Sequence, residues 1–392
     1  MSYIRDIEKE ILVRRAEDFG TIDSSKVYVI DGDVDMGSTS ITIPSTGIQI
    51  KGLGTVVSKL RSTQASYDMF VDAAGDCGDV FISGVDFIVS GAGSQVFNLT
   101  NGAGSNTFEL SDVNFTSCTK IGILTDFRQF LAVRGFMLSC TGGWEFAGTW
   151  AGGARISTFL VRAFTGTLFK GITGLTFGSR FLSDANIDIP SGSVGYDFAN
   201  ESMFTNDGDY ELLGGELTGA GTLTSGVSNT SVKSKWRDNN GIANTYVGSR
   251  WTLTSETATT VSATSTYYKA AGTTTYADEA WFSNSTDNAP VLDSSNPIEV
   301  ICSGALSLTA GNNQDLRVKV RQWDNSASAY VDLETMPQVT TSGTGNAQTV
   351  AVIAFATMEE NDRIELWVSN ESATANITLK ENSQFAILER AN

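Results

Sequence analysis

The sequence predicts an all-β protein, a parallel β-helix followed by a β-sandwich. Three observations support this prediction: glycine is abundant, short apolar strings recur between about residues 20 and 242, and alternating strands fill the last third. Glycine counts 39 against 5 for proline, which favours many turns and short strands. With 392 residues, 41% of them hydrophobic, the chain is long enough for two or three domains with sizeable cores.

One helix is expected, at residues 1–19. Ile4, Ile7 and Ile11 recur at helical spacing, and Gly20 stands where a helix stop is expected. Arg14 occupies the next place in this apolar series, so a coiled coil would span only about two heptads. Two interpretations stay open. The helix caps the open end of the following domain, or it is an anchor that docks on a larger assembly.

Residues 20–244 carry a degenerate repeat of strings with an apolar first residue. The pattern of strand, bend and strand is typical of stacked coils of about 25 residues that bury their inward side chains in one continuous core. We therefore predict a right-handed parallel β-helix of roughly eight coils with loops of variable length. The six strings are ISGVDF at 82–87, LSDVNF at 110–115, LAVRGF at 131–136, ISTFLV at 156–161, LSDANI at 182–187 and LLGGEL at 212–217.

Residues 245–392 change character, because the coil repeats stop and alternating strands take their place. In LRVKVRQW, at 316–323, apolar residues at 316, 318 and 320 alternate with charged residues at 317, 319 and 321. Polar turns such as AGNNQD and SGTGN separate the strands. About eight antiparallel strands in this length predict a jelly-roll β-sandwich.

Composition excludes several classes of function. The chain has no histidine, which removes Ser-His-Asp and Cys-His catalysis and histidine-ligated zinc. Its net charge of -18 opposes binding to nucleic acid and to anionic membranes. No signal peptide opens the sequence, and no apolar run approaches the roughly 20 residues of a membrane helix. We expect synthesis in the cytoplasm, reduced thiols, no membrane insertion and no cofactor.

Two groups of residues could suggest special chemistry. Asp31, Asp33 and Asp35 alternate as at the start of a calcium loop, but the sixth and twelfth places of that loop hold methionine and threonine instead of glycine and glutamate. We expect exposed carboxylates on the opening strand of the β-helix, and no metal site. Cys118 and Cys140 follow similar strings and are expected on adjacent coils, as free thiols, although the strand spacing allows a disulfide.

The order of these segments resembles that of bacteriophage tail fibres and tailspikes. The run ATMEENDRIELWVSNESATANITLKENSQFAIL, at 356–388, is similar to the end of the tumour-necrosis-factor-like jelly rolls that cap phage fibres. The run from SKVYVIDGDVDMG to ITIPSTGIQIKGLG, within 25–54, is similar to the first coils of pectate-lyase-like β-helices. The resemblance implies a homotrimer, made in the host cytoplasm and located in the virion. It also implies attachment to a virion protein through the N-terminal helix, and recognition of a bacterial surface polysaccharide.

Tailspikes of this kind often bind or cleave polysaccharide, and a glycosidase needs two carboxylates about 5 to 10 Å apart. Asp184 and Asp188 on one predicted coil, with Glu216 on a neighbouring coil, are the candidate set, but solvated strand or turn carboxylates would look the same. Trp144 and Trp150, in the glycine-rich run GGWEFAGTWAGG, are candidates for stacking on sugar rings. The same run could instead be a loop packed against the next subunit.

No catalytic constellation stands out in the sequence. We therefore predict a non-enzymatic fibre or tailspike adhesin, in which residues 1–19 are the anchor, 20–244 the β-helix and 245–392 the trimerisation or receptor-binding domain. A polysaccharide depolymerase and a bacterial surface adhesin are the alternatives.

Overall fold

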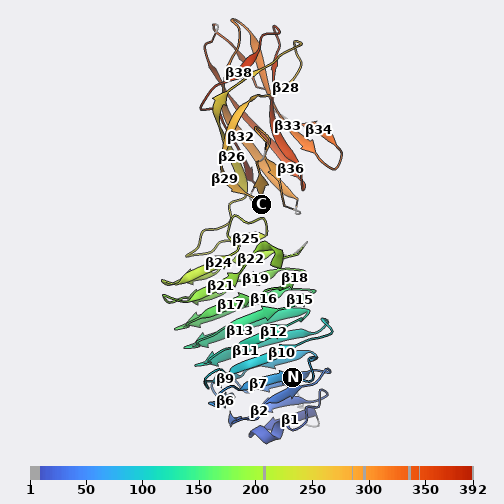
Figure 1. Ribbon diagram of the computed structural model, residues 1–392, viewed down its shortest axis with the longest axis vertical. Coiled ribbons are helices and arrows are strands. Elements are labelled where there is room, and N and C mark those ends of the chain that lie inside the picture. Colours follow the sequence, from blue (N-terminus) through green and yellow to red (C-terminus); the bar gives the residue numbers. More distant parts are fainter. Residues whose placement is uncertain are drawn as a thin grey trace, which may run out of the picture. The chain divides into compact units, whose positions relative to one another are not determined.

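The computed structural model describes residues 9–205, 209–284, 286–294, 297–333, 337–343 and 345–390. The chain divides into two compact units, Met1–Asn229 with Lys233–Asn244, and Thr230–Val232 with Thr245–Asn392. Figure 1 shows stacked strands in the first unit and a β-sandwich in the second. In the described part of the chain, helix is limited to 3-10 conformation at residue 9 and in two short turns, η2 (Ala16–Phe19) and η3 (Glu201–Met203). The predicted all-β class is confirmed.

The first unit is a parallel β-helix, as predicted, in which each coil adds one strand to each stack. A 15-stranded sheet contains the path β1-β2-β5-β8-β11-β13-β16-β19-β22-β25, and β3, β6, β9, β20 and β23 join beside it. An eight-stranded sheet runs β24-β21-β17-β14-β12-β10-β7-β4, and β15 pairs with β18. All of these pairings are parallel, so every inner strand has its backbone groups bonded on both edges.

The strands of the 15-stranded sheet are β1 (Glu10–Val13), β2 (Val27–Ile30), β3 (Asp33–Asp35), β5 (Ile48–Gly52), β6 (Lys59–Ser62), β8 (Val80–Ser83), β9 (Asp86–Val89), β11 (Thr107–Thr116), β13 (Gln129–Leu138), β16 (Ala154–Arg162), β19 (Phe181–Ser183), β20 (Asn186–Asp188), β22 (Tyr210–Leu213), β23 (Glu216–Thr218) and β25 (Ser234–Arg237). Those of the eight-stranded sheet are β4 (Ile41–Ile43), β7 (Asp68–Asp72), β10 (Gln95–Thr100), β12 (Gly122–Thr125), β14 (Trp144–Ala147), β17 (Thr167–Gly171), β21 (Val194–Phe198) and β24 (Thr222–Gly226). The pair is β15 (Thr149–Trp150) and β18 (Thr176–Phe177).

The predicted repeat follows these coils, but two of the six strings are out of register by one residue. Leu110 pairs with Ala132 instead of Leu131, and Ile156 pairs with Ser183 instead of Leu182. Ser183 fills an inward position that other coils give to an apolar residue, and its hydroxyl shares a 2.7 Å hydrogen bond with the hydroxyl of Tyr196. This bond satisfies a buried polar group, so serine is tolerated where the pattern predicts an apolar residue.

A single residue in the left-handed conformation makes the bend in several of these strings. Gly84, Asp112, Arg134 and Thr158 stand at this place on successive coils, with φ between 52° and 68°. Only glycine adopts this conformation without steric cost, and aspartate tolerates it better than threonine. The bend separates the part of each string that pairs in β8, β11, β13 and β16 from the part that follows it.

The first 19 residues do not form the predicted helix where the structure describes them. Glu10–Val13 is the strand β1, which pairs in parallel with β2 and places Ile11 beside Tyr28. Residues 16–19 form η2, which buries Phe19 against the Tyr28 ring, 5.7 Å away. The open edge of the first coil therefore imposes a strand on a sequence with helical spacing. Ile4 and Ile7 lie outside the described residues.

The cysteines of the β-helix lie as expected, whereas the three aspartates are not on the opening strand, which is β1, and Asp31 is half-buried between β2 and β3. Asp33 and Asp35 are exposed on β3 and pair with Arg61 of the next coil at 2.9 and 3.5 Å, and Asp31 pairs with an arginine at 2.8 Å. Cys118 and Cys140 are buried free thiols that follow paired strands on adjacent coils. Their sulfhydryl groups donate to the backbone oxygens of Phe87 and Phe115, at 3.2 and 3.3 Å.

The second unit is a sandwich of two antiparallel seven-stranded sheets, which confirms the predicted jelly-roll class. One sheet runs β27-β38-β32-β39-β26-β29 with β36 beside β32, and the other runs β30-β31-β37-β33-β34 with β28 beside β37 and β35 beside β33. The predicted alternation holds, because Leu316, Val318 and Val320 are fully buried between the sheets. Six short strands of two or three residues raise the number above the eight expected.

The strands of the first sheet are β26 (Gly248–Glu256), β27 (Ala258–Thr259), β29 (Gly272–Ala280), β32 (Ile298–Thr309), β36 (Gln348–Met358), β38 (Ile377–Leu379) and β39 (Gln384–Glu389). Those of the second are β28 (Tyr268–Lys269), β30 (Phe282–Ser283), β31 (Val291–Leu292), β33 (Asp315–Asp324), β34 (Ala329–Asp332), β35 (Gln338–Thr340) and β37 (Arg363–Asn370).

Candidate functional site

The three candidate carboxylates do not converge on one point. Asp184 follows β19 and is directed to the preceding coil, where its two oxygens accept hydrogen bonds from the Ser157 hydroxyl and the Thr158 backbone N–H. Thr158 is the residue that holds the left-handed bend on that coil. The Asp184 carboxylate therefore supports a strained bend, on the side away from the coil that carries Glu216.

Asp188 and Glu216 do share one face of the β-helix. β20 pairs with β23 so that Asn186 stands beside Glu216 and Asp188 beside Thr218, and the buried residues Ile187 and Leu217 lie between them. Asp188 and Glu216 are diagonal neighbours, one strand apart and offset by two residues along the strand. From the strand geometry, their Cα atoms are about 8 Å apart. Glycosidases depend on the separation of the carboxyl groups themselves, so a role of this pair in catalysis stays a prediction.

The expectation that Trp144 and Trp150 present their rings to solvent is wrong. Their exposed fractions are 1% and 0%, and both rings lie in the aromatic core of the β-helix. Trp144 stacks on Phe97 with ring centroids 5.6 Å apart, and the Trp150 indole N–H donates to the backbone oxygen of Ala147. The surrounding glycines do not mark an exposed loop, because they are the places where neighbouring coils approach each other.

A groove lies on the outer surface of the β-helix beside Gly142 and Gly143, the first two residues of this run. It encloses about 520 Å³ where the turns before β10, β12, β14 and β17 stack on one another. A Cβ atom on Gly143 would lie 1.9 Å from the backbone oxygen of Leu168, and one on Gly142 would lie 2.9 Å from that of Thr119. The coil contacts thus require glycine at both positions. Both glycines also line the groove, and we call the part beside them the notch.

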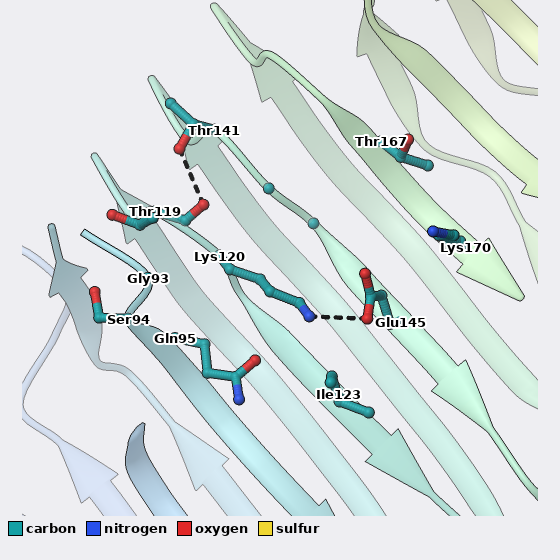
Figure 2. A pocket seen from close by; sticks show the side chains of 12 residues that line it. Gly93, Ser94, Gln95, Thr119, Lys120, Ile123, Thr141, Glu145, Thr167 and Lys170 are labelled. Carbon is teal, nitrogen blue, oxygen red and sulfur yellow. Dashed lines mark hydrogen bonds and ion pairs between the residues drawn. The ribbon is translucent and has the colours of Figure 1, made fainter. Parts of the chain in front are cut away.

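Polar side chains from four successive coils line the groove (Figure 2). The Lys120 ammonium and the Glu145 carboxylate form an ion pair of 2.8 Å across the notch. Thr119 and Thr141 form a ladder in which the hydroxyl of Thr141 donates to the Thr119 backbone oxygen. The full lining is Gly93, Ser94, Gln95, Thr119, Lys120, Ile123, Thr141, Gly142, Gly143, Glu145, Thr167 and Lys170.

The lining of this groove is polar and contains few groups that could act as an acid or a base. It contains one carboxylate, Glu145, which is already paired with an ammonium group, so it lacks the two carboxylates of a glycosidase. It has no aromatic ring in its lining, and it offers hydroxyl, amide and ammonium groups. Among the described residues, no group of three or more Asp, Glu, Cys or His side chains has the arrangement of a metal site.

The sandwich carries a second surface of interest, an apolar stretch on an edge strand. β36 pairs with β32 alone among the described strands, so one of its edges is open. Ile353 and Phe355 on its outer face are 47% and 57% exposed. Large apolar side chains on an open edge are unusual in a monomer, since they invite association with another chain.

The comparisons with known proteins identify no family. No protein-family profile matches the chain, and no curated protein matches it by sequence. Among solved structures, Eiger TNF from S. frugiperda is 8% identical with a TM-score of 0.30, and the match covers 38% of this chain and 94% of that one. Murine APRIL at pH 5.0 is 6% identical with a TM-score of 0.28, covering 37% of this chain and 99% of that one. These likenesses are too weak to bear on function.

The fold therefore defines this chain as a two-part all-β protein, with a parallel β-helix and a jelly-roll sandwich. No helix in the described ranges is long and apolar enough to cross a membrane. Sequence reasoning singled out the run GGWEFAGTWAGG, which supplies part of the groove lining, but it did so because of the two tryptophans, which do not line the groove. The groove uses its two leading glycines and Glu145, together with residues 95, 120 and 170 from other coils.

Proposed function

We propose that this protein is a fibre-type adhesin whose β-helix binds a bacterial surface glycan in the groove at Gly142 and Gly143. The observation that carries the proposal is the groove itself, a hollow of about 520 Å³ lined by hydrogen-bonding side chains on a rigid stack of strands. This volume is within the usual range of small-molecule sites. A hydroxyl-rich ligand matches the lining, because sugar hydroxyls both donate and accept hydrogen bonds.

Filling the groove tests this proposal. Thr167, the first residue of β17, lines the groove, and Thr167→Trp would place an indole in it. Thr42→Trp on β4, an exposed threonine of the same sheet, is the matched control. In a glycan-array measurement with the full chain, Thr167→Trp is expected to abolish binding that the wild type and Thr42→Trp retain. Equal binding by all three proteins would place the glycan site elsewhere.

We further propose that three copies associate through the outer face of β36, and that the trimer is part of a phage virion. The resemblance of the sequence to phage fibres and the exposed Phe355 on an open edge support this assignment. Phe355→Glu is expected to convert the oligomer to monomer in size-exclusion chromatography with light scattering. Val331→Glu, at a 46% exposed site on β34, is the control that should stay oligomeric. A wild-type monomer at micromolar concentration would contradict the proposal.

A second candidate function, polysaccharide cleavage, is favoured by one observation, the placement of Asp188 and Glu216 on one face of adjacent coils. Release of reducing ends from host capsule or lipopolysaccharide, abolished by Asp188→Asn or Glu216→Gln, would establish a depolymerase. Release that persists in both variants would assign the cleavage to other residues, and no release by the wild type would leave the adhesin.

A further inference from the structure

The groove is lined by a polar side chain whose amide has no hydrogen-bond partner in the described part of the chain. This residue, Gln95, is 9% exposed, and its amide atoms are not among the fully buried polar atoms that lack a partner, so they open into the groove. Figure 2 shows the Gln95 amide beside Lys120 and Ile123, with no contact drawn to either. The amide is therefore placed to bond to a group that enters the groove.

The groove also contains a second ammonium group, that of Lys170. β14 and β17 pair so that Lys170 stands beside Glu145, whose carboxylate pairs with Lys120 on the other side. On the next strand, β21, Lys170 stands beside Asp197. No ion pair within 4.0 Å joins Lys170 to either carboxylate within the part of the chain that the structure describes, so its ammonium group can still contact a ligand in the groove.

The Lys170 ammonium group, which makes no close ion pair, indicates which ligand the groove favours. Charges further away than about 8 to 10 Å are screened at physiological salt, so the net charge of the chain does not cancel the field of Lys170 at close range. A long polyanion would still meet the acidic surface beyond the groove. A ligand with one negative group among neutral hydroxyls can place that group near Lys170 without bringing further negative charges to the acidic surface.

The remaining polar groups suit the hydroxyls of such a ligand. The hydroxyl groups of Thr119 and Thr141 donate to backbone oxygens, which leaves their lone pairs free to accept from a ligand. The Thr167 hydroxyl has no partner among the described residues and lines the groove. The groove thus offers hydrogen-bond donors, hydrogen-bond acceptors and the Lys170 ammonium group to a ligand.

We propose that the groove binds a glycan that carries a sugar carboxylate, with Lys170 as the counter-ion of that carboxylate and Gln95 as a hydrogen-bond partner of the same sugar. This inference rests on the proposed function, since it specifies the class of glycan that the groove recognises. The ammonium and the amide together distinguish an acidic sugar from a neutral one, because only the acidic sugar brings a carboxylate that can form a close ion pair with Lys170.

The test is binding of the full chain to a glycan array that contains uronic-acid, sialic-acid and neutral oligosaccharides. Each acidic oligosaccharide is also presented with its carboxyl groups reduced to alcohols. Binding to carboxylate-bearing glycans is expected, with loss on carboxyl reduction. Lys170→Gln is expected to weaken this binding about tenfold or more, the usual worth of a hydrogen bond to a charged group. Lys51→Gln, at an exposed lysine on β5, is the matched control and should bind like the wild type.

The outcomes separate this inference from the proposed function. Binding confined to neutral glycans, blocked by Thr167→Trp, would keep the adhesin and overturn the acidic-sugar assignment. No binding to any glycan on the array or to whole host polysaccharide would overturn both. Inorganic polyphosphate that competes as well as the acidic glycan, with Gln95→Ala without effect, would show a simple anion site and overturn the role of the sugar.

Discussion

Replacing Trp144 by alanine is expected to destabilise the β-helix strongly. The indole is 1% exposed and lies among four phenylalanine rings, with centroids 5.1 Å away for Phe130, 5.6 Å for Phe97 and for Phe115, and 6.1 Å for Phe108. Removing a buried tryptophan costs about 3–5 kcal/mol, because the transfer free energy is lost and a cavity remains. Trp144→Phe keeps a ring in place and should lose a smaller part of this free energy.

Guanidinium unfolding followed by circular dichroism measures the effect, with the midpoint and the slope compared between wild type and variants. Because each coil contacts only its neighbours, the loss should also appear as faster hydrogen exchange in β10, β12 and β17. A folded Trp144→Ala protein with an unchanged midpoint and unchanged exchange would refute the placement of this ring in the core. Loss of glycan binding by Trp144→Phe at full stability would restore the stacking role that the buried ring excludes.

Three further predictions concern other buried polar groups. Glu365 is 2% exposed and accepts from Tyr330, Arg363 and Trp367. Glu365→Ala should therefore cost about 3–5 kcal/mol in urea unfolding, as when one partner of a buried ion pair is removed, and an unchanged midpoint would contradict this. Burial raises the pKa of Asp86 above its ordinary 3.8, so the folded state binds the proton more tightly and this group stabilises the fold below pH 3.8. That contribution is lost as the pH rises through the folded pKa, so Asp86→Asn should raise the melting temperature at pH 7, and the gain should shrink below pH 3.8. All four cysteine thiols are buried and free, so a disulfide reagent should titrate no rapid thiol in the native protein and four after unfolding.

The strands of the β-helix could be predicted because inward residues recur once per coil. The string LSDVNF places Leu110 and Phe115 inside and Asp112 at the bend, where a left-handed residue is required. The coil register could not be fixed to better than one residue. Ala132 and Ser183 occupy inward positions with side chains too small or too polar to be recognised against neighbouring leucines.

The N-terminal segment shows why a local pattern can mislead. Ile11 fits a helical series, but as a strand residue it pairs beside Tyr28 and extends the parallel sheet. An open strand edge offers a row of backbone donors and acceptors, and satisfying them outweighs a weak helical preference. The sequence contains no sign of this edge until the coil that follows has been placed.

The groove could not be predicted because its residues are far apart in the sequence, and none of them belongs to a recognisable binding motif. Gln95, Lys120 and Lys170 meet only when β10, β12 and β17 are stacked in the observed register. A shift of one residue in any coil would turn the side chain to the other face. The glycines were visible in the sequence, but their role depends on the Leu168 backbone oxygen, which a Cβ atom on Gly143 would meet at 1.9 Å.

The two proposed surfaces fit together through multivalency. A shallow polar groove that makes a few hydrogen bonds and one ion pair binds a single glycan weakly, since much of its interaction free energy only replaces bonds to water. Three copies joined through β36 would present three such grooves to a surface that repeats the same glycan, and linked sites gain affinity without new contacts. Phe355→Glu should then leave the affinity for a soluble oligosaccharide unchanged and greatly weaken adhesion to whole cells. An equal loss in both measurements would mean that the edge strand acts on the groove itself, which separate association and binding surfaces do not predict.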